Sequence, residues 1–352
     1  MSQFGFKISR PKDFLSVAAI ILFPMLVIVG QSETGSALVY VGFAFVLYRE
    51  GMSGWVLFLG FMAILLFVLT LAASPYTALM VLAGVTSFCD AVYTGKIKGW
   101  FVKYLPALVF LGFVPVILEN VWEAAGWNPE NMVKPAYIFI GVVLLTLPFI
   151  VFRAYRTRSG FTVLAAASLL AGVMLVYSTD FLFNNVLQDH QRKRIEVLLG
   201  LKDDPSGVGY NVNQSMIAIG SGGLFGKGYL QGTQTTYGFV PEQSTDFIFC
   251  TIGEEWGFVG SAAVILMFVF LIWRIITKAE RCKEAFTRIY GYCVASCIFM
   301  HLFINIGMTI GLMPVIGIPL PFISYGGSSL LAFTIMLFIF IALESNEKKF
   351  AS

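Results

Sequence analysis

The chain has 352 residues, of which 58% are hydrophobic and only 12% are charged. A water-soluble domain of this length needs far fewer apolar side chains to fill its core, so a soluble fold is excluded and much of the surface must face lipid. The formal net charge of +3 gives no support to nucleic acid binding, because in a membrane protein the positions of Lys and Arg matter more than their total.

Apolar stretches that can cross a bilayer recur along the whole chain. A span takes about 20 mostly apolar residues, because each backbone polar group must be satisfied within its own helix. The sequence predicts ten spans, at Phe14–Gly30, Ser36–Tyr48, Trp55–Ala73, Tyr76–Tyr93, Phe101–Glu119, Pro135–Phe152, Phe161–Asn184, Phe247–Trp273, Ile289–Leu312 and Tyr325–Leu343. We therefore expect an all-α polytopic membrane protein, with residues 1–352 forming a single integral membrane domain.

The distribution of Lys and Arg predicts the orientation of these spans. With the N-terminus in the cytoplasm, most of the 23 basic residues fall on the cytoplasmic side, as positively charged loops usually do. Both termini are then cytoplasmic, and one long connection, residues 185–246, lies outside. Long loops in compact proteins often carry binding or catalysis, so this large extracytoplasmic loop is where we expect the functional site.

The loop opens with a basic cluster in the sequence "QDHQRKRI". Arg192, Lys193 and Arg194 lie just outside the predicted membrane surface, on the side where positive charge is otherwise sparse. They can attract anionic lipid headgroups, or they can hold a pyrophosphate, which guanidinium groups bind through paired, charge-assisted hydrogen bonds. The residues alone leave both interpretations open.

The middle of the loop is rich in glycine, in the sequence "GVGYNVNQSMIAIGSGGLFGKGYLQGTQ". Gln214 and Ser215 open a short apolar piece, and Lys227 stands among the glycines. Repeated glycines let backbone amides approach an anionic ligand. For an arbitrary protein the favoured alternative is a glycine-rich turn that packs on the outer membrane surface, since no Walker-type or dinucleotide-binding fingerprint is present.

Carboxylates follow where the loop enters the next span, in "PEQSTDFIFCTIGEEWGF". Glu242 lies in the turn, Asp246 is expected at the first helical positions, and Glu254 lies about 80 degrees around an ideal helix from Asp246, which makes it the expected neighbour. An isolated Asp here most often caps the helix. Carboxylates at the start of a span are nevertheless costly to bury, which makes them functional candidates.

A proline-rich break precedes the last span, in "GLMPVIGIPLPFISYGGSSLL". Non-helical backbone at membrane depth is tolerated where protein covers it or where it lines a cavity. We expect this segment, with Ser324 and Tyr325 at its end, to form part of the wall of the same outer site.

Taken together, these motifs resemble the shape, elongation, division and sporulation (SEDS) family, and in particular its rod-shape branch, RodA. The resemblance rests on the glycine-rich motif, on "VPEQSTDFIFCTIGEEWGFVG" and on "MPVIGIPLPFISYGGSSLL", with weaker agreement at "QSETGSALV" and "HQRKRI". It implies a peptidoglycan glycosyltransferase of the bacterial plasma (inner) membrane that polymerises lipid II at the outer face during cell elongation.

The family's essential aspartate matches Asp246, which the resemblance makes the catalytic base. The other candidates would bind substrate: Arg192, Arg194, Lys227, Gln214, Ser215, Glu242, Glu254, Ser324 and Tyr325. A divalent cation, Mg or Mn, can share the neutralisation of the departing pyrophosphate, but the sequence names no ligand for it and no other cofactor. The implied partners are lipid II, a class B penicillin-binding protein and the elongation complex.

The sequence departs from the family pattern in three places. Ser32 and Glu33 stand where the family has Pro-Asp. The family's first four spans would precede residue 1, and "MSQFGFKISRPKDF" resembles the linker that follows them. Residues 54–160 are interpreted as an extra four-helix insertion. Two other functions stay open. One is a flippase or transporter of lipid-linked precursors, because transporters also contain broken helices and intramembrane carboxylates. The other is a noncatalytic scaffold.

Overall fold

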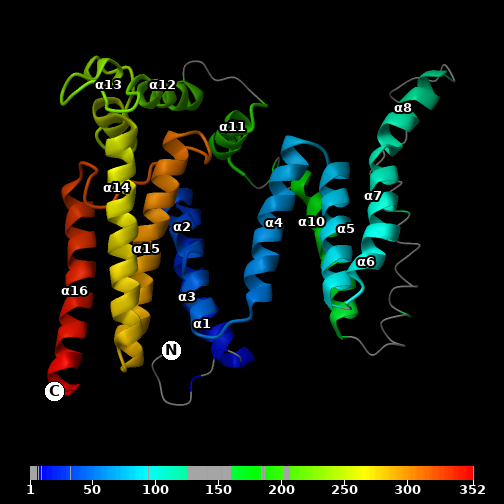
Figure 1. Cartoon of the computed structure of the whole chain (residues 1–352), viewed down its shortest axis with the longest axis horizontal. Helices are drawn as coiled ribbons and strands as arrows, with labels where there is room; N and C mark the ends of the chain where they lie inside the picture. Colours follow the sequence, from blue (N-terminus) through cyan, green and yellow to red (C-terminus); the bar gives the residue numbers. More distant parts are fainter. Residues whose placement is uncertain are drawn as a thin grey trace. The chain divides into compact units, whose positions relative to one another are not determined.

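In the part of the chain that the structure describes, helices are the only regular secondary structure, and turns and loops connect them (Figure 1). The computed structural model describes residues 6, 8, 10–31, 33–93, 95–124, 141, 152, 160–181, 183, 185, 187–201 and 207–351. Six helices in this part of the chain are long and apolar enough to cross a membrane: Lys12–Gly30, Gly54–Ala72, Pro75–Tyr93, Ile248–Arg281, Ala285–Thr309 and Gly327–Glu347. The predicted all-α polytopic membrane fold is confirmed.

The chain divides into two compact units. The first unit comprises residues 1–57 and 193–352, and the second comprises residues 58–192. The predicted single membrane domain and the four-helix insertion at residues 54–160 stay predictions, and the predicted span Pro135–Phe152 lies almost wholly outside the described residues.

The first unit is a helix bundle built around one central helix. Its helices are α1 (Pro11–Gly30), α2 (Thr34–Val41), α3 (Phe43–Arg49), α12 (Val208–Ser221), α13 (Thr233–Thr236), α14 (Ile248–Arg281), α15 (Ala285–Thr309) and α16 (Gly327–Ala351). In α15, 56% of the span is buried, compared with 17% for the spans of α14 and α16. Helices α2, α3, α12, α14 and α16 all pack against α15, so α15 forms the centre.

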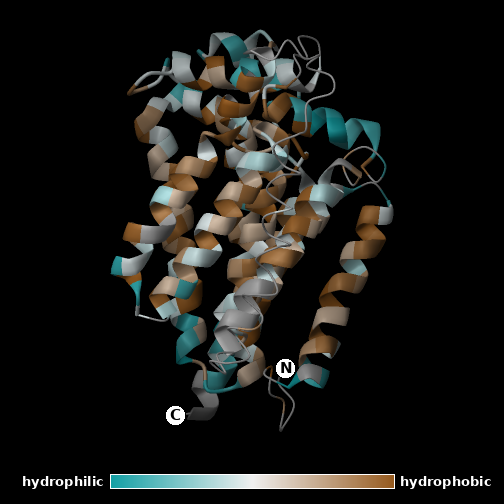
Figure 2. Ribbon diagram, turned by 90° about the vertical axis from the view of Figure 1, so that its right-hand side faces the viewer, coloured by the Kyte–Doolittle hydropathy of each residue, from teal (hydrophilic) through white to brown (hydrophobic). Residues whose placement is uncertain are grey.

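Apolar side chains from four helices form the core of this unit. Val46 of α3, Phe268 of α14, Ile298 of α15 and Phe340 of α16 belong to one buried cluster. Figure 2 shows the long helices as mostly hydrophobic ribbons and helix α11 (Asp189–Leu198) as mostly hydrophilic. The pattern is that of lipid-exposed helices packed around a shared apolar centre.

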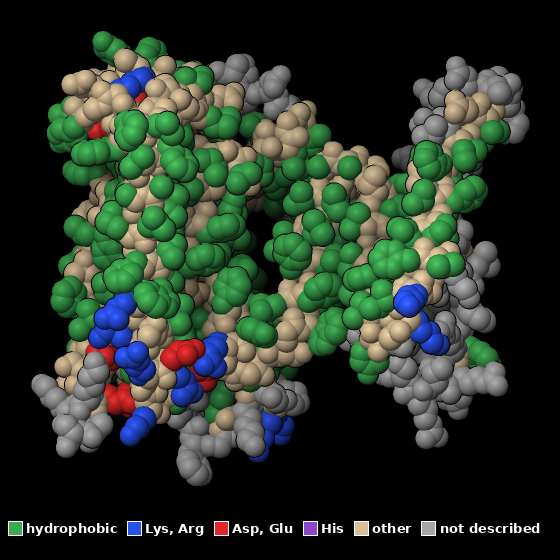
Figure 3. Space-filling model, in the orientation of Figure 1, with side chains coloured by type: hydrophobic (Ala, Val, Ile, Leu, Met, Phe, Trp, Pro, Cys, Tyr) green, Lys and Arg blue, Asp and Glu red, His purple; other side chains and the backbone are tan. Residues whose placement is uncertain are grey.

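Ion pairs tie the same four helices together at the end where α14 and α16 finish. Figure 3 shows Lys, Arg, Asp and Glu side chains gathered there, below a flank of apolar side chains. Three pairs join different helices: Arg49 with Glu280 at 3.0 Å, Arg288 with Glu50 at 3.1 Å, and Lys278 with Glu344 at 3.2 Å. We call this the basic end of the first unit, and the opposite end, which carries α12 and α13, the loop end.

The second unit has its own core. It contains most of α4 (Gly54–Ala72), then α5 (Pro75–Tyr93), α6 (Ile97–Gly99), the π-helix η1 (Trp100–Tyr104), α7 (Leu105–Gly112), α8 (Val114–Ala124) and α10 (Gly160–Phe181). Met62, Leu66, Leu79, Leu82 and Val176 form its buried cluster, in which α10 packs on α5.

The predicted span Phe101–Glu119 is not one continuous helix. It starts within a π-helical turn, and α7 ends at Gly112 before α8 starts at Val114. Pro115 explains the second break, because proline fits the first turn of a new helix but prevents the preceding helix from continuing.

Candidate functional site

Helix α14 is broken near its start, and the glycine loop (residues 220–228) fills the break. Gly257 has φ 64° and ψ −160°, outside the helical region. On one side of the break, the amides of Lys227 and Gly228 donate to the carbonyls of residues 254 and 255, both at 3.0 Å. On the other side, the amides of residues 258 and 259 donate to the carbonyls of Gly223 and Leu224, at 2.9 and 3.1 Å. The loop thus replaces the hydrogen bonds that the helix loses.

Close approach of two backbones explains why this loop needs glycine. A Cβ atom on Gly222 would overlap the carbonyl oxygen of Gly253, and one on Gly226 would overlap that of Glu255. The loop amides that would have formed an anion-binding nest instead bind α14. In this structure the glycine loop is therefore a turn that packs on α14.

Gly222 offers a matched test of this packing. Gly222→Ala is expected to destabilise the protein by about 1 to 3 kcal/mol, the usual cost of overpacking. The φ of −74° at Gly222 suits alanine, but a Cβ atom would crowd the carbonyls of Gly253 and Glu254. Gly220→Ala, two residues away in α12, has nothing within 4 Å of its Cβ and serves as the control. Thermal unfolding in one detergent measures both, and equal stability of the two variants would contradict the docking of the loop.

Glu254 is the buried anchor of the segment that follows the loop. Its side chain is 0% exposed. Oε1 accepts hydrogen bonds from Lys227 Nζ at 2.7 Å and from the amides of Thr233 and Gln234 at 2.8 and 2.9 Å. Oε2 accepts from the amide and the hydroxyl of Thr235, at 2.9 and 2.8 Å. One carboxylate therefore holds both the start of α13 and the end of the glycine loop.

These contacts give two of the predicted site residues partners within the protein. Glu254 was expected beside Asp246, but its carboxylate is directed to Lys227 and to the segment at 233–235. Lys227 was expected to meet a substrate, but its ammonium lies between Glu254 and the hydroxyl of Thr233, at 2.7 Å from each. In this structure both side chains build the loop end.

Asp246 lies in a turn just before α14, which begins at Ile248 rather than at Asp246. Three successive carbonyls of this turn, residues 244–246, each accept a hydrogen bond from α15 or from the segment before α16. The donors are the amide of Tyr325 at 2.8 Å, Ser324 Oγ at 2.6 Å and Asn305 Nδ2 at 2.8 Å. The backbone of Asp246 is therefore held on the central helix.

The carboxylate of Asp246 is half-buried, and charged neighbours act on it from two sides. Burial and the negative charge of Glu242 raise the pKa of Asp246 above the ordinary value, while Arg194 opposes them. One wall of the site is the backbone of Gly317, because a Cβ atom there would lie 3.1 Å from Asp246 Oδ2. A carboxylate with a raised pKa in a partly covered site suits general base chemistry.

The first turn of α2 packs near the same wall. A Cβ atom on Gly35 would lie 2.8 Å from the carbonyl oxygen of Ile316, next to Gly317. Ile318 continues the contact, since it clusters with Val39 and Ile304. The "QSETGSALV" and "MPVIGIPLPFISYGG" motifs, which lie far apart in the sequence, thus meet beside Asp246.

The other predicted site residues are placed as follows. Ser215 is buried in α12, where its hydroxyl donates to the carbonyl of Thr309 at 3.0 Å, and Gln214 is half-buried beside it. The side chain of Ser324 is buried, whereas that of Tyr325 is 80% exposed. Arg192 of α11 forms an ion pair with Asp189 at 3.3 Å.

Asn305 is the site residue that sequence reasoning missed. It stands in the apolar run "MHLFINIGMTIG" of α15, and a lone amide inside a span was the available signal. Its position beneath Asp246 depends on the fold and could not be derived from that run.

The oxygen donors near Asp246 suit a hard cation. Among the described residues there is no group of three or more His, Cys, Asp or Glu side chains that could hold a metal ion. Mg²⁺ is commonly bound by only one or two carboxylates together with waters and substrate phosphates. Among the described residues, Gln243 Oε1 is buried with no hydrogen-bond partner, and the carboxylate of the preceding residue, Glu242, accepts a hydrogen bond from Thr245 Oγ1 at 3.0 Å. These are oxygen donors of the kind that such an ion takes.

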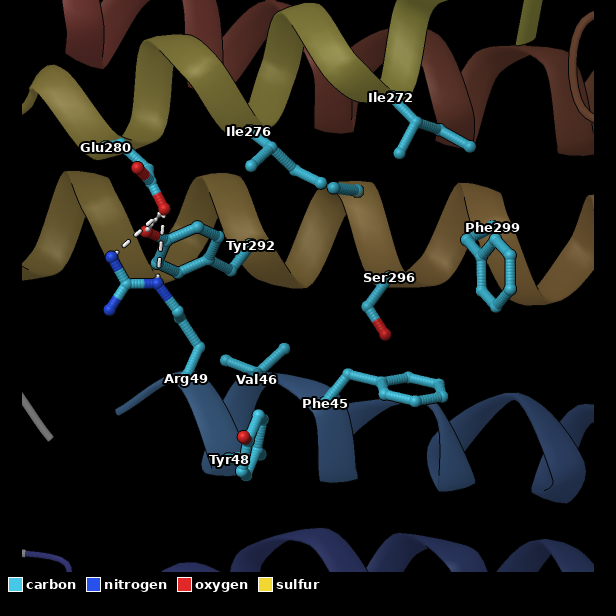
Figure 4. Close-up of a pocket in the computed structure, with 11 residues that line it drawn as sticks. Phe45, Val46, Tyr48, Arg49, Ile272, Ile276, Glu280, Tyr292, Ser296 and Phe299 are labelled. Carbon is cyan, nitrogen blue, oxygen red and sulfur yellow. Dashed lines mark hydrogen bonds and ion pairs between the residues drawn. The ribbon is translucent and has the colours of Figure 1, made fainter. Parts of the chain in front are cut away.

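A separate groove of about 390 Å³ lies elsewhere in the first unit. Helix α15 forms its floor through Tyr292, Ser296 and Phe299, while α3 and α14 form its walls (Figure 4). The ion pair between Arg49 and Glu280 joins the two walls at one end. The groove contains none of the predicted site residues.

Comparison with known proteins identifies similar chains. The family model FtsW/RodA/SpoVE, described as cell cycle protein, matches residues 132–349. The peptidoglycan glycosyltransferase MrdB of Escherichia coli K12 is 38% identical over 223 residues, which cover 59% of this chain and 60% of MrdB. The peptidoglycan glycosyltransferase RodA of Treponema pallidum is 39% identical over 180 residues, 51% of this chain and 41% of that protein.

A solved structure described as "Structural coordination of polymerization and crosslinking by a peptidoglycan synthase complex" is 23% identical, with a TM-score of 0.41, and covers 89% of this chain and 96% of that one. The chain thus spans about 60% of the length of its E. coli relative, and the matched family region includes every predicted site residue.

Proposed function

Because the chain belongs to the FtsW/RodA/SpoVE family of cell cycle proteins, we propose that it is a peptidoglycan glycosyltransferase that polymerises lipid II into glycan strands. The observation that supports this most is the placement of Asp246. A half-buried carboxylate with a raised pKa is held by its backbone at the loop end of a membrane bundle. A lipid-linked sugar donor can reach such a position sideways from the bilayer.

The reaction follows from the groups around Asp246. Its carboxylate takes the proton of a sugar hydroxyl on the acceptor while that oxygen forms a bond to the anomeric carbon of the donor. The bond from that carbon to the lipid pyrophosphate breaks, and the pyrophosphate leaves with the electron pair. One base and one leaving group suffice for direct displacement with inversion, and general base catalysis contributes about 10²- to 10⁴-fold.

The departing pyrophosphate needs positive charge. Arg194 acts on Asp246 and is the cation that we assign to this role, together with Arg192 of the same helix, since guanidinium groups hold phosphate oxygens through paired hydrogen bonds. Lys227 is engaged by Glu254 and is not proposed for it. A divalent cation held by Glu242 and Gln243 would neutralise further charge on the pyrophosphate when bound.

The cellular setting is also part of the proposal. We place the protein in the bacterial plasma membrane with the loop end outside and both termini cytoplasmic, which puts the ion-paired basic end inside, in agreement with the positive-inside tendency. A class B penicillin-binding protein would crosslink the new strands within an elongation complex.

The deciding test is synthesis of glycan strands from lipid II by the purified, folded product of the complete gene, with its cognate transpeptidase present. A parallel assay measures movement of lipid II between the leaflets of vesicles. Strands without leaflet exchange support the polymerase. Leaflet exchange without strands would instead identify a flippase, and neither activity would favour a scaffold.

The pH dependence of strand synthesis is a second expectation. The base works only when ionised, and its pKa is raised, so the rate should rise with pH through a midpoint above the usual range of an aspartate. Glu242→Gln removes a negative neighbour and should move this midpoint to lower pH, whereas Arg194→Gln should move it to higher pH. The profile of kcat/KM measures all three, and a midpoint that neither substitution moves would remove Asp246 from the role of base.

A further inference from the structure

Asn305 combines complete burial with an unusual hydrogen-bonding pattern. Its side chain is 0% exposed inside α15. Nδ2 donates to two carbonyls from different segments, that of Asp246 at 2.8 Å and that of Ile318 at 2.7 Å. Oδ1 is buried and has no hydrogen-bond partner among the residues that the structure describes. Leaving a buried acceptor unsatisfied costs free energy. The two hydrogen bonds that Nδ2 donates must therefore offset the cost of the unsatisfied Oδ1.

The two carbonyls define the position of the Asp246 carboxylate. The first belongs to Asp246 itself and fixes its backbone. The second belongs to Ile318, the residue after Gly317, whose backbone forms the wall beside Asp246 Oδ2. A single amide group therefore fixes the backbone of the residue that carries the carboxylate. It also fixes the backbone next to the surface that limits the movement of that carboxylate.

We infer that Asn305 is a positioning residue that holds the Asp246 carboxylate at a fixed depth against the Gly317 wall. The inference rests on the proposed function and extends it to a residue that touches neither substrate nor reacting atoms. Ser324 has a different role. Its hydroxyl bonds to the carbonyl of Thr245 and the amide of Leu320, and these partners include neither Asp246 nor Ile318.

Asn305→Leu in the complete gene product tests the role, because leucine has a similar size and donates no hydrogen bond. Misplacement of a catalytic group by about 1 Å can cost about 10²-fold in rate, so we expect kcat to fall by that order while KM changes little. Asn305→Asp, protonated in this buried position, keeps one donor, so its kcat should lie between those of the wild type and Asn305→Leu. The control is Ser296→Ala, which alters a buried, unpartnered hydroxyl of the same helix and should leave kcat unchanged.

The pH profile separates positioning from a general loss of structure. With Glu242 and Arg194 left in place as the charged neighbours of Asp246, a carboxylate released from its wall gains solvent, so Asn305→Leu should move the rate midpoint to lower pH. Gly317→Ala, which crowds the carboxylate, should move it to higher pH. A fall in kcat with an unmoved midpoint, or an unchanged kcat in a folded variant, would overturn the inference.

A readout that does not depend on glycan synthesis keeps this test apart from that of the proposed function. The rate at which a carbodiimide labels Asp246, followed by mass spectrometry across pH, reports the protonation and the accessibility of the carboxylate. Faster labelling with a midpoint at lower pH in Asn305→Leu supports the inference, even if no protein makes strands. Identical labelling in the wild type and in Asn305→Leu overturns it, even if the wild type is active.

Discussion

Asp246→Asn is expected to lower the rate of strand synthesis by about 10²- to 10⁴-fold, the contribution of a general base, while the protein stays folded and binds lipid II. Asparagine has nearly the shape of aspartate, and the backbone contacts of Asp246 with Asn305 do not involve the carboxylate. The change therefore removes the proton acceptor with little effect on the turn. Strand length and initial rate from lipid II, measured with saturating transpeptidase, give the result.

Glu242→Gln is the matched control for this substitution. It removes a carboxylate four residues away, in the same turn, but leaves the proposed base in place, so it should shift the pH profile and lower strand synthesis less than Asp246→Asn does. Undiminished strand synthesis by folded Asp246→Asn would exclude Asp246 as the base. If the protein exchanges lipid II between leaflets but makes no strands, with or without the Asp246 carboxylate, the flippase alternative would be supported.

Glu254→Leu is expected to produce the largest loss of stability, about 3 to 5 kcal/mol, the usual cost of removing one partner from a buried ion pair. The substitution leaves the Lys227 ammonium without its carboxylate and deprives the amides of residues 233–235 of their acceptor. Lys227→Met should cost less, because the remaining hydrogen bonds still compensate the charge of Glu254. Thermal unfolding in a single detergent ranks the variants.

The double variant Lys227→Met with Glu254→Leu gives the coupling between the two residues. Residues in contact are not additive, so the double variant should be more stable than the sum of the single losses predicts. If Lys227→Met kept full stability but lost strand synthesis, Lys227 would return to the role of stabilising the pyrophosphate. If the losses simply added, the ion pair would not be the anchor of the loop end.

Most spans could be predicted from the sequence, because the need for about 20 apolar residues acts on each helix separately. Helices α4 and α5 begin within one residue of their predicted positions. Two other predicted spans are interrupted, which hydropathy alone does not register. Ser36–Tyr48 is divided at Gly42 into α2 and α3, and Phe101–Glu119 contains a π-helical turn and a break before Pro115.

The contacts within the site were harder to predict. Glycines suit both an anion-binding nest and close backbone packing, so the sequence could not distinguish these two roles for the glycine loop. The distinction depends on the break in α14 at Gly257, which the sequence did not predict. Helical geometry placed Glu254 near Asp246, but a carboxylate is directed by its donors, and these come from residues 227 and 233–235. The choice of Asp246 as the central residue came from the family resemblance and stays a prediction.

The pairing between the glycine loop and α14 also fixes the length of the loop. Carbonyls at residues 223 and 224 and amides at residues 227 and 228 meet partners on both sides of one helix break, so inserting or deleting a single residue between them would separate one set of partners from the other. The turn at Tyr237 and Gly238 is less restricted, because its amides bond to carbonyls at residues 233–235 of the same short segment and because Tyr237 is exposed. A tag or probe inserted for labelling therefore belongs at that turn and not in the loop.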